Sequence, residues 1–320
     1  MTGSRAPVLV TGLPRSGTSW VGKMLEASGD VVYVNEPLNP SHPPGRSPGV
    51  LDAQVEHYFQ YICPDNEWPW VRAYADTVAL RYHPVRELRA NRDPYDVARA
   101  AKYTAAFTAG RLRRRAALLD DPYATMSVAW FADRLGTRAV VLVRDPVAFV
   151  GSWRALGWTV DPAELLAQPL LMRDHLEPLR EDLERLAGSP DWLATSCVLW
   201  RAAYTVVSAV TATRRHVLVR RHEDLAADPV EAFRSLYADL GLRWHDAARA
   251  HVQKATSAGS ATPTGFRWSL KGGLSRTAFQ PMDSRAALGS YRTRLREDEI
   301  GRVLDLTEDV RSRYYAESPV

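Results

Sequence analysis

Short apolar runs alternate with amphipathic stretches along much of this chain. Residues 7–11 (PVLVT) form a β-branched run that is typical of a buried parallel strand. In residues 18–28 the apolar positions recur at helical spacing, and Gly29 follows as a stop signal. This opening therefore predicts a strand, a loop at 12–17 and a helix.

The same strand-and-helix pattern recurs further along. Strands are expected at 31–34, 139–143 and 217–219, and helices at 124–135, 146–155, 193–213, 229–240 and about 297–310. Strands that alternate with helices favour a parallel sheet. The sequence thus predicts one α/β domain over 1–320, a three-layer fold with a central parallel sheet flanked by helices.

One region departs from this pattern. Residues 37–48 are rich in Pro, Ser and Gly and are expected to form a loop. From there to about residue 119 the spacing is helical but irregular, with aromatic and proline residues at 68–70 and 82–84. We interpret residues 40–119 as a helical insertion that faces the substrate.

Composition and charge exclude several classes. The 320 residues carry a net charge of +4, and arginine rather than lysine supplies nearly all of the positive charge. Arginine suits anionic ligands because its fork of donors matches phosphate and sulfate. A basic run long enough for nucleic acid is lacking, and the two cysteines have no CxxC partner for a zinc site. No secretion stretch and no 18-residue apolar run is evident, so we expect a cytoplasmic protein without a membrane segment. Nothing predicts an oligomeric state.

The first loop has the features of an anion cradle. Residues 12–19 (GLPRSGTS) lie between a strand and a helix, where glycines and free N–H groups bind phosphate. The spacing of Gly12 and Gly17 matches a nucleotide-binding P-loop, but Thr18 stands where such a loop has lysine. Arg15 lies inside the loop instead. A P-loop kinase or nucleotidase is therefore the alternative to a protein that binds a different anion.

Here the resemblance to a known family becomes specific. LPRSGTSW, residues 13–20, resembles the 5′-phosphosulfate loop of sulfotransferases that use 3′-phosphoadenosine-5′-phosphosulfate (PAPS), in the form found in tyrosylprotein sulfotransferases and bacterial relatives. The resemblance implies a P-loop-like fold and implies that Arg15 binds the phosphosulfate and supports the transition state. It also implies contacts from the loop residues Ser16, Gly17, Thr18 and Ser19.

A carboxylate follows the second predicted strand. Glu36 lies 21 residues after Arg15, and strands that run parallel end at one edge of a sheet. Tyrosylprotein sulfotransferases have a catalytic Glu in the matching place, which makes Glu36 the candidate general base. We expect Arg15 to lower the pKa of Glu36 and the anionic donor to raise it again. His42 and His83 are the alternative bases.

A second motif resembles the 3′-phosphate site of the same superfamily. Residues 140–146 (VVLVRDP) form a strand that ends in Arg144, and Ser152 follows about two helical turns later. The resemblance implies that Arg144 and Ser152 bind the adenosine 3′-phosphate. Arg154 is a possible helper, and a structural turn capped by Asp145 is the alternative.

Three features depart from the family or match it weakly. His222 stands where relatives have a Tyr near the adenine, so its contact with the cofactor is open. Asp120 stands where relatives tend to have a leaving-group lysine, which leaves Lys23, Lys102 or an arginine to replace it. The basic segment 271–276, or 283–285 as the alternative, is the candidate for the loop that closes over the cofactor.

The sequence therefore predicts a sulfotransferase with PAPS as co-substrate and PAP as product. Negative charge builds on the oxygen that leaves with the 5′-phosphate, where Arg15, the loop N–H groups and the helix dipole stabilise it. No metal is required. The acceptor is a hydroxyl of a glycan, glycolipid or small metabolite, with a protein tyrosine less favoured. A non-catalytic relative that only binds PAPS or PAP is the other alternative.

Overall fold

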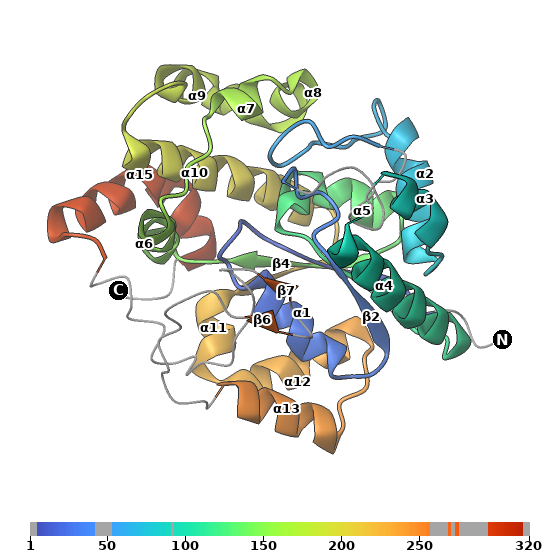
Figure 1. The fold of residues 1–320 in the computed structure, drawn as a ribbon. Coiled ribbons are helices and arrows are strands. Elements are labelled where there is room, and N and C mark those ends of the chain that lie inside the picture. Colours follow the sequence, from blue (N-terminus) through green and yellow to red (C-terminus); the bar gives the residue numbers. More distant parts are fainter. Residues whose placement is uncertain are drawn as a thin grey trace.

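The sheet has five strands and is parallel throughout (Figure 1). The computed structural model describes residues 5–41, 53–90, 93–256, 268–269, 273–274 and 294–315. The strand order is β2-β3-β1-β4-β5, and each neighbouring pair is parallel. The strands are β1 (Val8–Thr11), β2 (Val31–Asn35), β3 (Ala116–Asp120), β4 (Arg138–Val143) and β5 (Val217–Arg221). The predicted α/β fold class is confirmed.

Alternate side chains of each central strand enter two different cores. Val8 and Val10 of β1 belong to one hydrophobic cluster, whereas Leu9 between them belongs to the other. The same alternation separates Leu118 from Leu119 on β3. Because both faces are buried, the strands read as continuous apolar runs rather than as alternating ones.

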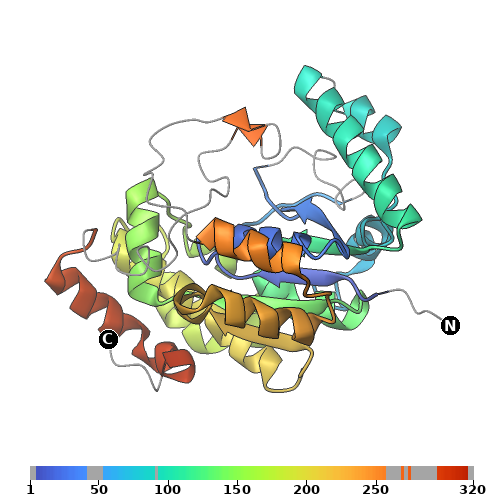
Figure 2. The ribbon, with the colours of Figure 1, turned by 90° about the horizontal axis from the view of Figure 1, so that it is seen from below.

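Helices from the N-terminal and the C-terminal parts of the chain cover one face of the sheet (Figure 2). These are α1 (Thr18–Glu26), α11 (His222–Ala227), α12 (Pro229–Leu240) and α13 (Asp246–Thr256). Met24 of α1 and Phe233 of α12 are fully buried against the strands on this side. This layer places the start of α1 and the start of α11 at the same edge of the sheet.

The opposite face is covered by a second layer. It comprises α5 (Val128–Arg134), α6 (Pro146–Leu156), α10 (Trp192–Thr211) and α15 (Glu297–Tyr315), with short helices α7 (Ala163–Leu166), α8 (Pro169–Leu171) and α9 (Arg180–Leu186) outside α10. A π-helical turn (Met172–Leu176) and two 3₁₀ turns (Pro122–Ser127, Glu177–Leu179) connect these helices. A two-stranded antiparallel ribbon joins β6 (Trp268–Ser269) to β7 (Gly273–Leu274).

Helix α10 corrects the expectation that the chain has no long apolar run. It is long and apolar enough to cross a membrane, but 78% of its most apolar window is buried inside the protein. Trp200 and Tyr204 on this helix are completely buried. A core helix meets the same criterion of length and composition, so this helix is weak evidence for a membrane segment.

The region predicted as a helical insertion is only partly helical. It contains α2 (Trp68–Val78), α3 (Pro84–Ala90) and α4 (Pro94–Leu112). The prediction that helical structure continues to residue 119 was wrong, because residues 116–120 (AALLD) form the strand β3 next to β1. A short apolar run of this kind does not distinguish a strand from a buried helical segment.

The strand order sets the neighbours of β1. Strand β3 lies between β1 and β2 and pairs with both, so Arg15 and Glu36 follow strands that are not adjacent. After β1 the chain adds strands on one side of the sheet, whereas after β4 it adds β5 on the other side. In open α/β sheets, ligands bind outside the carboxyl ends of the strands, at the point where the strand order reverses in this way. That point lies between β1 and β4.

Candidate functional site

The loop after β1 is held in place by the strand and helix of the second motif. Gly12 has φ 139°, and a Cβ there would lie 2.4 Å from the carbonyl oxygen of Leu142 on β4. The indole Nε1 of Trp153, on α6, donates to the carbonyl oxygen of Pro14 at 2.9 Å. Gly17 precedes α1, and no side chain caps that helix. The first N–H groups of α1 are thus left for an anion.

Arg15 faces the second motif. Its Nε donates to the Oγ of Ser152 at 3.3 Å, although 137 residues separate the two. Burial lowers the pKa of Arg15, and the charge of Arg294 lowers it further. The fold therefore brings together the two residues that the sequence assigned to opposite ends of the PAPS molecule.

Arg144 joins the same cluster. Its Nη1 donates to the carbonyl oxygen of Arg15 at 2.6 Å, while its Nε is buried without a hydrogen-bond partner among the described residues. Burial lowers the pKa of Arg144 to about 10, Glu223 opposes this, and Arg15 and Arg294 add to it. Arg144 remains charged at neutral pH, with one donor unused within the described part of the chain.

Glu223 does not neutralise the three arginines. It accepts the backbone N–H of Asp145 at 3.1 Å and the hydroxyl of Tyr315 at 2.8 Å. Burial raises the pKa of Glu223. The space around Arg15, Arg144 and Arg294 therefore has an excess of positive charge that an anionic ligand would balance.

Arg294 was missed by the sequence analysis. It acts on Arg15 and Arg144 through its charge, although it lies 150 residues beyond Arg144. No motif surrounds it. Arg154, by contrast, points elsewhere: its Nη1 is 2.6 Å from Glu299 and its guanidinium lies over the ring of Trp192. The structure therefore does not bring Arg154 to Arg144 and Ser152.

The hydroxyl groups of the loop face the protein. Ser16 is completely buried; its Oγ lies 3.2 Å from the hydroxyl of Tyr204, and its N–H donates to the carbonyl oxygen of Leu13 at 2.9 Å. The hydroxyls of Thr18 and Ser19 lie toward the buried carboxylate of Asp120, whose pKa they lower. Contacts from these residues to a phosphosulfate stay a prediction.

His222 lies directly behind the phosphate loop. A Cβ on Gly17 would be 2.7 Å from its Nδ1, and the ring of Trp20 meets it edge-on at 5.5 Å. Burial and the charge of Arg144 lower the pKa of His222 to about 3. His222 is thus a neutral imidazole that fills the place beside Gly17, and its contact with an adenine stays open.

Glu36 ends β2 with an unusual backbone angle, φ 44°. Its N–H donates to the carbonyl oxygen of Asp120 at 2.7 Å, and its Oε2 accepts from the Nδ2 of Asn39 at 2.7 Å. Burial raises the pKa of Glu36 to about 7, and the charge of Asp120 contributes to this rise. The expectation that Arg15 lowers this pKa was therefore wrong, because the charge that acts on Glu36 is an anion from β3.

The alternative residues lie in other places. His83 binds Asp76 through its Nε2 at 2.7 Å, between α2 and α3. Lys23 lies over the ring of Tyr33 and 2.9 Å from Glu26, and Lys102 has Lys23 as a charged neighbour. His42, most of segment 271–276 and segment 283–285 lie outside the described residues.

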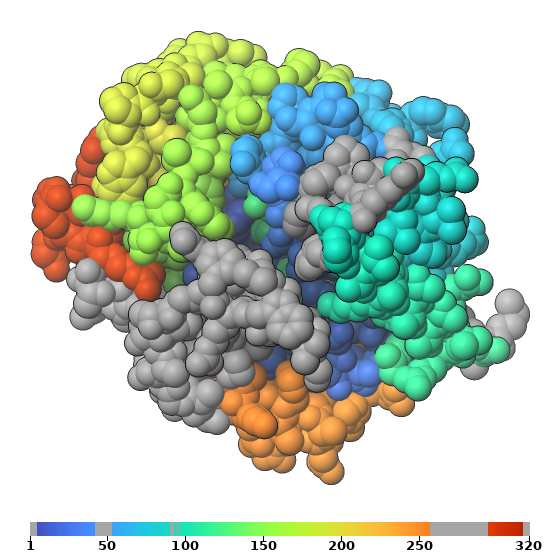
Figure 3. Space-filling view, viewed as in Figure 1, coloured from blue at the N-terminus to red at the C-terminus, as the bar shows by residue number. Residues whose placement is uncertain are grey.

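The surface is hollowed over the N-terminal segment, between the green segment of α6 and the blue and cyan segments that follow β2 (Figure 3). Two cavities formed by described residues lie away from Arg15 and Glu36. One, of about 310 Å³, lies among α9, α10 and α15; the other, of about 450 Å³, is lined by Tyr61, Cys63, Trp130 and His175. The arginine cluster lies at the carboxyl edge of the sheet, after β1 and β4.

Comparisons with known proteins identify a family for this chain. The sequence profile of the sulfotransferase family matches residues 7–246. No curated protein shows a significant match. Similar solved structures include a sulfotransferase domain from the curacin biosynthetic pathway (TM-score 0.49, 11% identity, 95% of this chain and 98% of that one). A sulfotransferase from Mycobacterium avium (0.45, 14%, 100% and 78%) and a mouse sulfotransferase complexed with PAP (0.40, 11%, 98% and 85%) are also similar. The matched residues span β1 to β5, and the chain belongs to the sulfotransferase family.

Proposed function

We propose that this protein transfers a sulfuryl group from PAPS to a hydroxyl acceptor. The observation that carries the proposal is the hydrogen bond from Arg144 to the backbone carbonyl of Arg15, between the ends of β1 and β4, where the order of the strands reverses. The buried Nε of Arg144 lacks a partner among the described residues, and the start of α1 lacks a side-chain cap. Donors left unpaired in a cationic site fit a ligand with anionic groups at two ends.

The residues divide the work between the two ends of the donor. Arg144 and Ser152 would hold the 3′-phosphate, and Arg15 with the N–H groups of α1 would hold the 5′-phosphosulfate. As the S–O bond to the 5′-phosphate breaks, Arg15 stabilises the negative charge that passes to the leaving oxygen. The acceptor oxygen forms the new S–O bond and its proton goes to Glu36.

The pKa of Glu36 supports its role as the base. A carboxylate with a pKa of about 7 is a stronger base than an exposed one and is still largely ionised at slightly alkaline pH. Glu36 lies at the end of β2, on the far side of β3 from β1. An acceptor bound beside Glu36 would therefore approach from the β2 side of the donor.

Aromatic side chains from the region 40–119 support an acceptor site on that side. Burial raises the pKa of Tyr123 and the charge of Glu36 adds to the rise, so the two side chains are neighbours. The ring of Tyr58 lies 6.3 Å from the ring of Tyr123 and is 38% exposed, whereas Phe59, at 5.8 Å, is completely buried beneath the surface. The exposed ring of Tyr58 offers an aromatic face to a sugar ring or a planar aglycone. We propose a glycan, glycolipid or small-metabolite hydroxyl as the acceptor.

Thermal unfolding with added ligands tests the donor site. PAP at 100 times its dissociation constant should stabilise the protein by roughly 2.7 kcal/mol, whereas ADP, which lacks the 3′-phosphate, should not. The R144Q variant should lose the response to PAP. R234Q is the matched control, because Arg234 is an exposed arginine of α12 paired with Glu231.

Two outcomes of this experiment contradict the proposal. A larger shift with magnesium ATP than with PAP would favour a kinase or nucleotidase. The absence of any shift would remove the assignment of PAPS as the donor and leave a relative that has lost the cofactor site.

A further inference from the structure

The end of β3 provides a buried carboxylate that the proposed mechanism does not use. Asp120 pairs in register with Asn35, the last residue of β2, so the backbone of Asp120 lies beside the residue that precedes Glu36. The N–H of Glu36 donates to the carbonyl oxygen of Asp120 at 2.7 Å. Asp120 is completely buried. The sheet therefore fixes the backbones of Asp120 and Glu36 side by side, and the charge of Asp120 reaches the Glu36 carboxyl.

Burial raises the pKa of Asp120, whose Oδ1 has no hydrogen-bond partner among the described residues, but several neighbouring groups oppose this rise. The hydroxyl of Tyr33, on β2, donates to its Oδ2. Thr18 and Ser19 contribute hydroxyls from α1, and Lys23 contributes a positive charge from the same helix. The ammonium of Lys23 lies 3.4 Å from the centre of the Tyr33 ring. These groups oppose the effect of burial, which by itself favours the protonated acid.

Glu36 is surrounded differently. Asn39 donates one hydrogen bond to it. The other titratable groups that face Glu36 are Tyr33, Asp120, Asp121 and Tyr123. The charge that acts on Glu36 among the described residues is thus negative, and none of its described titratable neighbours is a cation.

Asp121 is less suited than Asp120 to supply that charge. Its Oδ2 accepts the N–H of Leu38 at 2.6 Å and its Oδ1 accepts the N–H of Tyr123 at 3.0 Å. Burial raises the pKa of Asp121 well above its usual range, and no side chain of opposite charge opposes this among the groups that act on it. Asp121 thus organises the turn after β3, while Asp120 is the carboxylate with donors and a cation to support its charge.

We propose that Asp120 is a positioning residue for Glu36, and that its buried negative charge makes the neighbouring carboxylate a stronger base. The physical basis is the repulsion of two like charges in a buried site, which forces one of them to keep its proton. Tyr33 and Lys23 both favour the charged form of Asp120, so Glu36 is the carboxylate that keeps its proton. This inference rests on the proposed function only in calling Glu36 the base of the reaction.

A titration of Glu36 tests the inference without any assay of activity. Protein labelled with ¹³C at the glutamate side-chain carboxyl carbon is titrated by NMR, and the E36Q variant assigns the Glu36 signal. In the wild type we expect the midpoint near neutral pH. D120N should lower the proton affinity of Glu36 at least tenfold, which is about one pH unit. D246N is the matched control, since Asp246 is exposed on α13, and it should leave the midpoint unchanged.

A second variant, Y33F, tests the inference in case D120N does not fold. Y33F keeps the Asp120 carboxylate but removes the hydroxyl that stabilises its charge. Asp120 then protonates more readily, so the midpoint of Glu36 should fall, by less than in D120N. If Glu36 titrates at the same pH in the wild type, D120N and Y33F, burial alone sets its proton affinity and the inference is overturned.

The pH dependence of kcat/KM separates this inference from the proposed function. If Glu36 is the base, the acid limb of the profile should move to lower pH in D120N, together with the NMR midpoint. A midpoint that moves while the rate profile stays fixed would support the role of Asp120 and remove Glu36 from the reaction.

Discussion

Two site residues have backbone angles that side chains rarely adopt. Arg15 has φ 79° and Glu36 has φ 44°, and each lies just after the carboxyl end of a strand. Such angles in residues other than glycine cost about 1–3 kcal/mol and persist where the surroundings hold them. Here the carbonyl oxygen of Arg15 accepts from Arg144, and the N–H of Glu36 donates to Asp120. Stability is therefore given up at the residues that the proposed reaction uses.

The raised pKa of Glu36 also makes the folded protein less stable, and this loss depends on pH. Its pKa is about 7 in the folded protein, against 4.5 when unfolded, so the folded state binds more protons between these values. The free energy of unfolding therefore falls as pH rises from about 4.5 to 7. E36Q removes this loss. Relative to the wild type, the free energy of unfolding of the variant should rise by up to roughly 3 kcal/mol between pH 4.5 and pH 8. Urea unfolding at both pH values measures this gain.

The same variant should lose about 100-fold in sulfuryl transfer, because it cannot accept the acceptor proton. Glutamine keeps the oxygen that accepts from Asn39, so the fold is not disturbed. Equal stability of E36Q and wild type at both pH values would show that Glu36 ionises normally in the folded protein.

At the scale of elements, the start of α1 depends on a glycine packed against another helix. Gly17 has φ 96°, and α11 places the ring of His222 where a Cβ would be. The loop thus approaches α11 closely only because position 17 has no side chain. Burial lowers the pKa of His222 and the charge of nearby Arg144 lowers it further, so a displaced imidazole would disturb the proposed cofactor site.

G17A should therefore cost more than backbone strain alone. G29A is the matched control, since Gly29 also has positive φ (70°) but a Cβ added there would meet no atom within 4 Å. We expect a cost of about 1 kcal/mol for G29A and roughly 2–3 kcal/mol for G17A, with weaker PAP binding in G17A alone. In a double-mutant cycle, H222A should recover part of the loss in G17A. Equal losses in the two glycine variants would show that the contact with His222 is unimportant.

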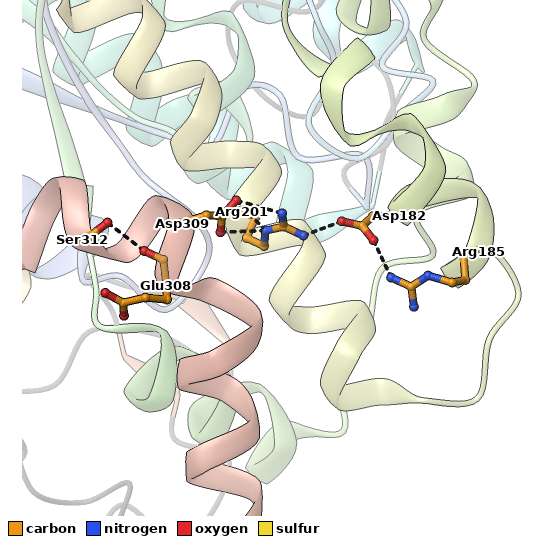
Figure 4. Close-up of polar contacts among 6 residues, drawn as sticks. All are labelled: Asp182, Arg185, Arg201, Glu308, Asp309 and Ser312. Atoms are coloured by element: carbon orange, nitrogen blue, oxygen red, sulfur yellow. Dashed lines mark hydrogen bonds and ion pairs between the residues drawn. The ribbon is translucent and has the colours of Figure 1, made fainter.

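Across the whole molecule, the last helix ties the core to the site. Arg201 on α10 binds Asp182 of α9 at 2.7 Å and Asp309 of α15 at 2.8 Å (Figure 4). At the end of α15, Tyr315 donates to Glu223, which in turn accepts the N–H of Asp145 beside Arg144. The docking of α15 therefore fixes Glu223, the carboxylate that acts on Arg144.

Loss of the Arg201 link should loosen that docking. Its side chain is only 18% exposed and bridges two carboxylates, so R201Q should cost about 1.5–3 kcal/mol in the free energy of unfolding. R180Q, which removes an exposed arginine paired with Glu177 and Glu184, should have no measurable effect. Chemical denaturation measures both, and equal effects would mean that the Arg201 bridge is no stronger than a surface ion pair.

Local patterns predicted a large part of the fold and the phosphate loop. The strands at the start of the chain and at 138–143, and helices such as α6 and α12, were predicted to within one or two residues, because an apolar run with its flanking Gly, Pro or Asp is a short-range signal. The loop around Arg15 and the strand that ends in Arg144 were found for the same reason. The family resemblance implied that both bind one PAPS molecule, whereas their direct contact appears only in the structure.

The relations between distant segments came from the tertiary structure. Sequence did not reveal β3, because AALLD suits a strand or a helix until β1 and β2 are seen on either side of it. Nor did it reveal Arg294, which no motif marks. The expected effect of Arg15 on the pKa of Glu36 was wrong for a related reason: burial raises this pKa, and the charge that adds to the rise belongs to Asp120 on β3. The order of residues along the chain thus determines which groups lie at each strand end. Strand pairing decides which charges come close together, because electrostatic and burial effects depend on neighbours in space.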